Sequence, residues 1–216
     1  MILKQLQELI GGIYDIRVTH DVYDFLITDR QQLPAGAPSG PTDEQLLVAQ
    51  RGGDVGVTLY LDAQLLDRLQ HADPLESLHG GNVADFCTAL EGVSHFVYLA
   101  WNAGFDKRVS LRELEMQAEI DKYVTSYWLM KRQLPDRFPA ELLRVLFERA
   151  RVDSRLAQGR EGLYRDASRY AEKFCRKLDG VLRASRRHSG REVLAELRRF
   201  YRLTDASKVA HIERSA

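Results

Sequence analysis

Cysteine is scarce in this chain, with only Cys87 and Cys175 among its 216 residues. Both lie in helix-like apolar patterns, where a thiol behaves as a small buried hydrophobic group. We therefore expect a fold that needs no disulfide and a reducing compartment. The first ten residues also lack the basic start and the long apolar run of a signal peptide, so the expected location is cytoplasmic.

Long apolar runs are missing as well. The longest one, around residues 93–103, is interrupted by Ser94, His95 and Asn102, and it falls short of the ~20 apolar residues that a membrane-spanning helix needs. No membrane association is therefore expected. The overall content of 44% hydrophobic and 29% charged residues is typical of an ordinary globular protein.

The best-known active-site signatures are absent from the sequence. It contains no glycine-rich phosphate loop, no Cys-x-x-Cys pair, no His-Glu-x-x-His and no Gly-x-Ser-x-Gly. These motifs would have pointed directly to an enzyme class. Whether the chain is an enzyme is therefore left open by the sequence.

The charges are balanced in number but segregated along the chain. The 31 basic and 31 acidic side chains give a net charge of 0. Residues 1–130 hold 9 basic and 19 acidic side chains, whereas residues 131–216 hold 22 and 12, so the two balances are −10 and +10. This segregation indicates either a basic surface for an anionic partner or two halves that neutralise each other by packing.

Strand-like patterns are confined to the N-terminal third of the chain. After a short first helix ending at Gly11-Gly12, alternating residues at 14–18 and 23–27 predict a β-hairpin, and residues 55–61 predict a third strand. Between them, the Thr42 and Gln45 capping-box pattern predicts a short helix through residue 50. The expected sheet is thus small, antiparallel and made of about three strands.

Helical spacing dominates the rest of the sequence. The main predicted helices cover residues 82–104, 110–133, 140–151, 160–187 and 191–203. The predicted fold class is therefore α+β and predominantly helical, with the small N-terminal antiparallel sheet followed by a bundle of about five helices. The two portions, residues 1–72 and 73–216, have no linker long enough to separate them, so we expect one merged domain.

A polar stripe on the otherwise apolar helix at 82–104 forms the first candidate site. Glu91 and His95 lie one helical turn apart, where they can act as an acid/base pair or share a metal ion. A second polar stripe on the next helix is expected to face it. The candidate catalytic residues are Glu91, His95, Glu115, Glu119 and Lys122.

Tyr98 and Asn102 continue the first stripe, and we expect them to share the same semi-buried cleft. The structural alternatives are that these groups satisfy one another in the core, or form ladders within one helix. No cofactor is predicted, although a single divalent metal ion stays open as an alternative. Its ligands would be Glu91, His95, Glu115 and Glu119. The spacing of Glu91 and His95 differs from the Glu-x-x-His of di-metal bundles, which argues against a two-metal site.

The arginine-rich C-terminal region is the second candidate site. Arginine favours bidentate contacts with phosphate, so nucleic acid is one expected partner. The interspersed Glu192 and Glu196 instead favour a solvated face of ion pairs. The candidate anion-binding residues are Arg183, Arg186, Arg187, Arg198, Arg199 and Arg202.

Three functions follow from these patterns. The leading expectation is a cytosolic accessory or regulatory protein that binds a protein, a second copy of itself or an anionic partner. It depends on the missing catalytic motifs, the segregated charge and the Pro/Gly-rich loop at residues 33–41. The alternatives are a hydrolytic enzyme that uses the Glu/His/Lys cluster, with or without a divalent metal ion, and a nucleic-acid-binding protein that uses the C-terminal arginines.

Overall fold

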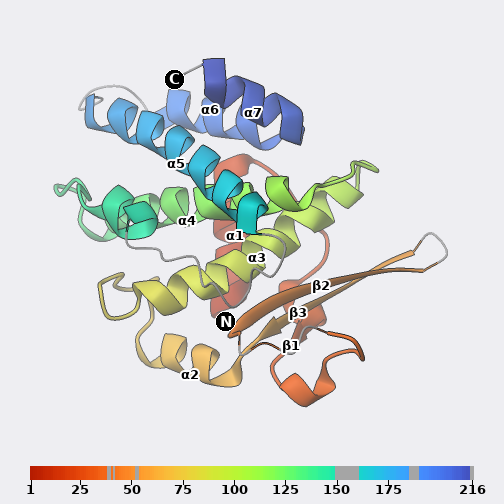
Figure 1. Ribbon diagram of the computed structural model, residues 1–216. Coiled ribbons are helices and arrows are strands. Elements are labelled where there is room, and N and C mark those ends of the chain that lie inside the picture. Colours follow the sequence, from red (N-terminus) through yellow and green to blue (C-terminus); the bar gives the residue numbers. More distant parts are fainter. Residues whose placement is uncertain (38–39, 41, 52–53, 149–160, 185–189, 215–216) are drawn as a thin grey trace.

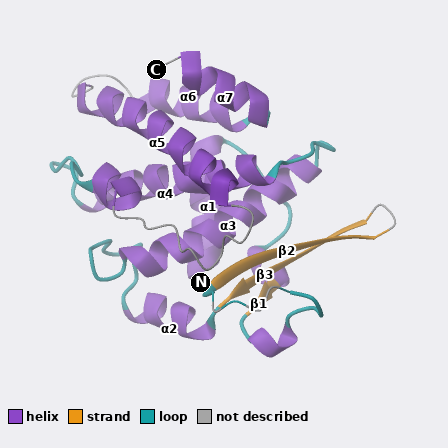
Figure 2. Cartoon of the chain, viewed as in Figure 1, coloured by secondary structure: helices purple, strands orange, loops and turns teal. Residues whose placement is uncertain are grey.

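The computed structural model describes residues 1–37, 40, 42–51, 54–148, 161–184 and 190–214 (Figure 1). Within these ranges the chain is mostly helical, with one small sheet near the N-terminus (Figure 2). The α+β, predominantly helical fold class predicted from the sequence is confirmed. Positions 38, 39 and 41 of the predicted 33–41 loop lie outside the described residues.

The sheet is mixed rather than antiparallel throughout. It contains β1 (Leu26–Ile27), β2 (Glu44–Arg51) and β3 (Asp54–Leu61), in the order β1-β3-β2. β2 runs antiparallel to β3, whereas the short β1 pairs with β3 in parallel. The predicted third strand at 55–61 is confirmed by β3.

The predicted hairpin of residues 14–18 and 23–27 is wrong. The first helix, α1 (Ile2–Tyr14), continues through Gly11-Gly12, because five of its residues form one buried stripe at helical spacing. The helix ends at Tyr14, and the next residue, Asp15, has a left-handed φ of 53°. Residues 22–25 then form a 3₁₀ turn, so that only Leu26–Ile27 is extended.

The predicted helix over residues 42–50 is also wrong, because these residues form β2. The capping-box pattern of Thr42 and Gln45 is a local signal. It is outweighed by a ladder to β3 that runs from Glu44 opposite Leu61 to Arg51 opposite Asp54, and by packing of β2 against α3. The correction places Glu44 on a strand beside the central helix.

The helices after β3 follow the sequence pattern more closely. They are α2 (Ala63–His71), α3 (Val83–Ala103), α4 (Leu111–Gln133), α5 (Glu161–Ala184), α6 (Gly190–Tyr201) and α7 (Asp205–Arg214). Ser110 caps α4 as predicted, since its side chain accepts a hydrogen bond from the Glu113 amide at 3.0 Å. In its described part, the predicted 140–151 helix is helical from residue 142 and continues as a π-helical turn at Arg144–Glu148. The helix α7 is one that the sequence pattern did not indicate.

The central helices α3 and α4 organise the molecule (Figure 1). The sheet and α2 pack against α3, α5 packs along α4, and α1 contacts α3, α4 and α6. One cluster of buried hydrophobic residues extends from Leu3 of α1 to Ile212 of α7. None of the helices in the described ranges is both long and apolar enough to cross a bilayer.

Candidate functional site: a charged cluster around His95

His95 lies on α3 with 4% of its surface exposed, and a carboxylate faces each of its ring nitrogens. Nδ1 is 3.6 Å from Oε1 of Glu44 on β2, and Nε2 is 3.6 Å from Oε2 of Glu115 on α4. Both distances exceed the roughly 2.7–3.2 Å of a good hydrogen bond. Within the described part of the chain, His95 Nε2 and Glu44 Oε1 are buried without a hydrogen-bond partner.

A lysine joins the remaining carboxylates of this region. Nζ of Lys122, on α4, lies 2.5 Å from Oε2 of Glu91 and 2.8 Å from Oε1 of Glu119. Lys122 therefore links α3 to α4 one turn away from His95. The structure thus brings together all five residues named from the sequence and adds a sixth. We call the group the His95 cluster: Glu44, Glu91, His95, Glu115, Glu119 and Lys122.

Glu44 is the member that sequence reasoning missed. A helix over residues 42–50, as the capping-box pattern predicts, gives no reason to place Glu44 near α3. One local signal favours the correct structure: Gly52-Gly53 stands between two apolar runs, and such a dipeptide is typical of a hairpin connection. Glu44 reaches the cluster because β2 pairs with β3 and both strands pack on α3.

Gly92 allows the sheet to approach α3 closely enough for this contact. A Cβ atom at position 92 would lie 2.8 Å from Cδ1 of Leu59 on β3, and 3.1 Å from Cγ of Glu44. Any larger residue would force the side chains of Leu59 and Glu44 out of their positions against the helix. The glycine therefore positions Glu44 beside His95, which lies three residues further along the same helix.

The cluster stabilises positive charge. Burial lowers the pKa of His95, but its interactions with Glu115 and Glu44 outweigh burial and raise the pKa well above the ordinary value. Burial raises the pKa of Glu44, and His95 offsets this only in part. For Glu91, burial likewise raises the pKa, yet the nearby Lys122 and His95 lower it overall. Four carboxylates thus surround one lysine and one imidazole.

The donor atoms also suit a metal ion. One ligand atom each from Glu44, Glu91 and His95 can be chosen so that all three lie within 4.8 Å of one another. One imidazole with carboxylate oxygens is a set used for Zn²⁺, Mn²⁺ and Fe²⁺ in proteins. Glu115 faces the other ring nitrogen of His95, which is where metal-binding histidines usually meet a second carboxylate.

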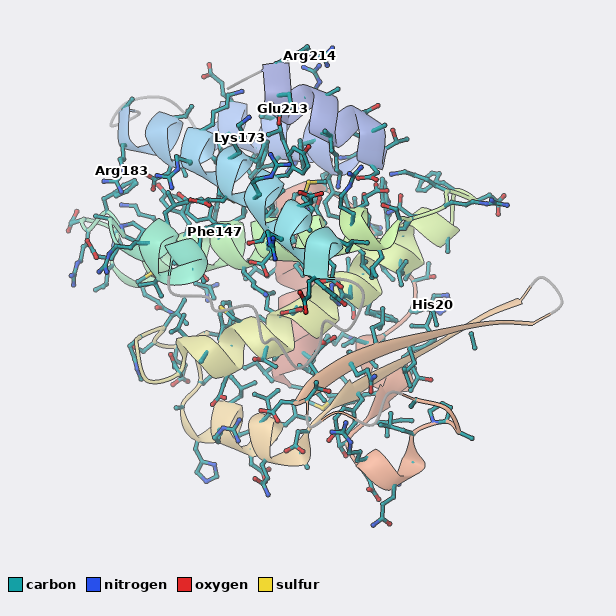
Figure 3. The ribbon with its side chains drawn as sticks, in the orientation of Figure 1. His20, Phe147, Lys173, Arg183, Glu213 and Arg214 are labelled. Atoms are coloured by element: carbon teal, nitrogen blue, oxygen red, sulfur yellow. The ribbon has the colours of Figure 1, made fainter. Side chains whose placement is uncertain are left out.

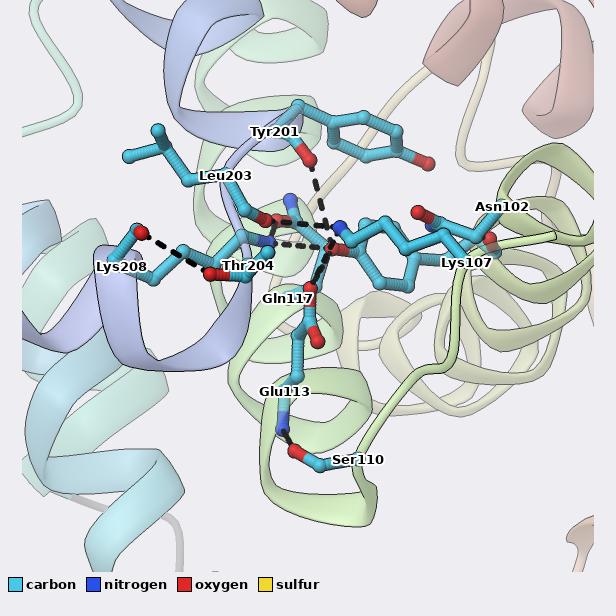
Figure 4. A network of polar contacts seen from close by, with 11 residues as sticks. Asn102, Lys107, Ser110, Glu113, Gln117, Tyr201, Leu203, Thr204 and Lys208 are labelled. Atoms are coloured by element: carbon cyan, nitrogen blue, oxygen red, sulfur yellow. Dashed lines mark hydrogen bonds and ion pairs between the residues drawn. The ribbon is translucent and has the colours of Figure 1, made fainter. Parts of the chain in front are cut away.

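Tyr98 does not join His95, contrary to the expectation of one shared cleft. Its hydroxyl donates to Oε1 of Glu113 at 2.5 Å and accepts from Nζ of Lys208 at 2.9 Å. Figure 4 labels Glu113, Gln117 and Lys208 of this network. Asn102 donates back to the Tyr98 carbonyl, one turn earlier on α3. The polar stripe of α3 therefore divides, because residues 95 and 98 differ by about 60° around a helix and face different neighbours.

Most residues of this second network are buried in the core. Lys208 of α7 is fully buried and also donates to Oε1 of Gln117 at 2.6 Å. Gln117 in turn donates to Asp121, which also accepts hydrogen bonds from Tyr14 and Ser94 at 2.5 Å each. Its members join α1, α3, α4 and α7, so its role is to fix these helices to one another.

The candidate anion-binding arginines mostly contact internal acceptors. Arg183 pairs with Asp179 and donates to the Ala140 carbonyl. Arg198 and Arg202 donate to the carbonyls of residues 12–15 at the end of α1. Arg199 is exposed, while Arg186 and Arg187 lie outside the described residues.

Other basic residues of α5 form surface ion pairs. Lys173 of α5 and Glu213 of α7 lie side by side, 2.8 Å apart (Figure 3), and Arg169 and Arg176 pair with acidic residues one turn earlier on α5. These basic side chains of the C-terminal half are therefore paired with acidic side chains.

A comparison of the chain with models of protein families, with curated proteins and with solved structures finds no significant match.

Proposed function

We propose that the His95 cluster binds a divalent metal ion and that the protein acts through this ion. One observation carries the proposal: a buried imidazole has a carboxylate opposite each ring nitrogen, at distances that leave hydrogen-bonding capacity unused. Buried polar atoms normally have a partner. An ion between Nδ1 of His95 and Oε1 of Glu44 would supply one for the Glu44 carboxylate.

The separation of His95 and Glu44 matches that between two ligands of one ion. Metal–nitrogen and metal–oxygen bonds of about 2.1 Å at a tetrahedral centre place neighbouring ligand atoms roughly 3.4 Å apart. Nδ1 of His95 and Oε1 of Glu44 are 3.6 Å apart. In this proposal Glu44, Glu91 and Nδ1 of His95 are the ligands. When the ion binds, it would replace the proton on Nδ1, and Glu115, which lies 3.6 Å from Nε2 in this structure, would accept a hydrogen bond from Nε2 and so orient the ring.

The chemistry that fits such a centre is metal-assisted hydrolysis. A bound divalent ion polarises carbonyl or phosphoryl oxygens and lowers the pKa of a coordinated water. Binding of an anionic partner through the C-terminal arginines has less support, because Arg183, Arg198 and Arg202 already contact internal acceptors. The cluster, by contrast, has an excess of carboxylates over cations.

The test is a titration of the metal-free protein with Zn²⁺ and with Mn²⁺ by isothermal calorimetry. We expect one ion per chain. His95→Ala and Glu44→Gln should each weaken binding by tenfold or more, since each removes a ligand. Glu115→Gln should weaken it by about tenfold, because the carboxylate that orients a histidine ligand typically contributes that much to metal affinity.

His211→Ala is the matched control. His211 also contacts a glutamate, Glu196, at 2.5 Å, but it lies on α7 outside the cluster. Its removal should leave the metal affinity unchanged. The proposal fails if no variant of the cluster alters binding, or if His211→Ala weakens it as much as His95→Ala. Hydrolysis of p-nitrophenyl phosphate by the metal-loaded protein, and its loss in His95→Ala, tests the reaction class.

A further inference from the structure

Lys122 occupies an unusual position for a lysine. Only 12% of its side chain is exposed, and its ammonium group lies between a carboxylate of α3 and one of α4. Surface lysines usually extend into water with the charged group fully hydrated. Here the charge is held inside the His95 cluster, where four carboxylates converge.

Glu91 contacts Lys122 and also belongs to the group of potential metal ligands. Its Oε2 lies 2.5 Å from Nζ of Lys122, and the same carboxylate supplies one of the three donor atoms that group with Glu44 and His95. An ion bound there would place two positive charges close to the lysine ammonium. Like charges repel strongly where water is scarce, so the two cations disfavour each other's presence.

Glu119 offers Lys122 a second place to bind. It lies on α4, three residues before Lys122, with its Oε1 2.8 Å from Nζ. It does not belong to the group of potential metal ligands found among the described residues. Lys122 can therefore leave Glu91 and keep one carboxylate partner on its own helix.

We propose that Lys122 is a built-in competitor of the metal ion. It neutralises Glu91 while the site is empty, gives up Glu91 and keeps Glu119 when the ion binds, and thereby sets the affinity of the site. This inference deepens the proposed function and rests on it. Lys122 and Glu119 are then not ligands, but they determine how tightly the ligands hold the ion.

The test is a double-mutant cycle of Zn²⁺ affinity, measured by competition with a chromophoric chelator. Lys122→Met keeps the length of the side chain and removes the charge, so it should tighten binding by tenfold or more. Glu119→Gln should weaken binding severalfold, because Lys122 then depends on Glu91 alone. In the Lys122→Met background, Glu119→Gln should have little further effect.

That last comparison separates competition from simple electrostatics. If Glu119 acts only through its own charge, its loss weakens binding equally with and without Lys122, and the inference is overturned. Lys173→Met is the control, since it removes a lysine paired to a glutamate at the same 2.8 Å, but on the α5–α7 surface. It should leave the affinity unchanged.

The outcomes distinguish the two proposals. Equal affinities of the wild type and Lys122→Met overturn the inference and leave the metal site intact. An absence of binding in both overturns the metal site itself. If circular dichroism shows that Lys122→Met does not fold, Lys122→Gln, which can still hydrogen-bond to Glu119, takes its place with the same expected direction.

Discussion

Lys208 and Tyr98 are 110 residues apart in the sequence, yet Nζ of the lysine lies 2.9 Å from the tyrosine hydroxyl inside the core. Lys208 has no exposed surface, and the same hydroxyl donates to the carboxylate of Glu113. Burial lowers the pKa of Lys208 to about 7, and the charge of Glu113 only partly opposes this. The core therefore holds a lysine that titrates near neutral pH.

This lysine should make the stability depend on pH. Its pKa falls from 10.5 in the ordinary case to about 7 on folding, so the unfolded chain binds more protons between these values. The free energy of unfolding should then rise with pH from about 7 upwards, by up to ~1.4 kcal/mol per pH unit from this residue. Below about pH 7 both states are protonated and the contribution is constant.

Lys208→Met provides the comparison, because it removes this titration and keeps a side chain of similar length. Urea unfolding of both proteins at about pH 7, 8 and 9 should show the wild type gaining stability relative to the variant at each step. A stability difference that stays the same across this range would contradict a near-neutral buried lysine.

Gly92→Ala should displace the side chains that the sheet packs against α3. The added methyl group would meet the side chain of Leu59 at 2.8 Å and that of Glu44 at 3.1 Å, so these buried side chains must give way, at a cost of about 1–3 kcal/mol in the free energy of unfolding. The displaced Glu44 side chain should then lie farther from His95, so Zn²⁺ binding should weaken. Chemical denaturation and the calorimetric titration measure the two effects.

Gly180→Ala is the control for this change. Gly180 lies on an exposed face of α5 with nothing within 4 Å of an added Cβ. Alanine is the better helix former, so this variant should gain about 0.5–1 kcal/mol and keep its metal affinity. If Gly92→Ala behaves in the same way, the close contact between α3 and the sheet is not what positions Glu44.

Substitutions of Arg202 and Arg199 should have sharply different effects on stability, although the two residues are only three positions apart. Arg202 donates to the carbonyls of Tyr14 and Asp15, where α1 ends. Replacing it with methionine should cost about 1–2 kcal/mol, since terminal carbonyls and the helix dipole lose a cation. Arg199→Met should change stability by less than about 0.5 kcal/mol. Thermal unfolding of both variants decides this, and equal losses would contradict the role of Arg202.

The parts of the site that lie on long helices can be predicted from the sequence. The apolar spacing of 82–104 and the Ser110 cap define α3 and α4. On a helix, residues four apart share a face, so helical spacing alone pairs Glu91 with His95, and Glu115 with Glu119. The short connection between the two helices in turn predicts that both stripes face each other.

Glu44 and Lys208 cannot be predicted in this way. The contact of Glu44 with His95 depends on strand pairing and on a glycine in another element, neither of which a local pattern contains. Lys208 lies in a helix that ordinary periodicity does not reveal, and charged residues are assigned to solvent by default. Its partners, Tyr98 and Gln117, are about a hundred residues away.

The most direct test of the metal site is the anomalous difference density of a crystal grown with Zn²⁺. We predict a single strong peak per chain, with Oε atoms of Glu44 and Glu91 and Nδ1 of His95 at about 2.0–2.2 Å. Nζ of Lys122 should then lie closer to Glu119 than to Glu91. A crystal that shows no peak within this cluster, with Lys122 still bound to Glu91, would contradict the proposed metal site.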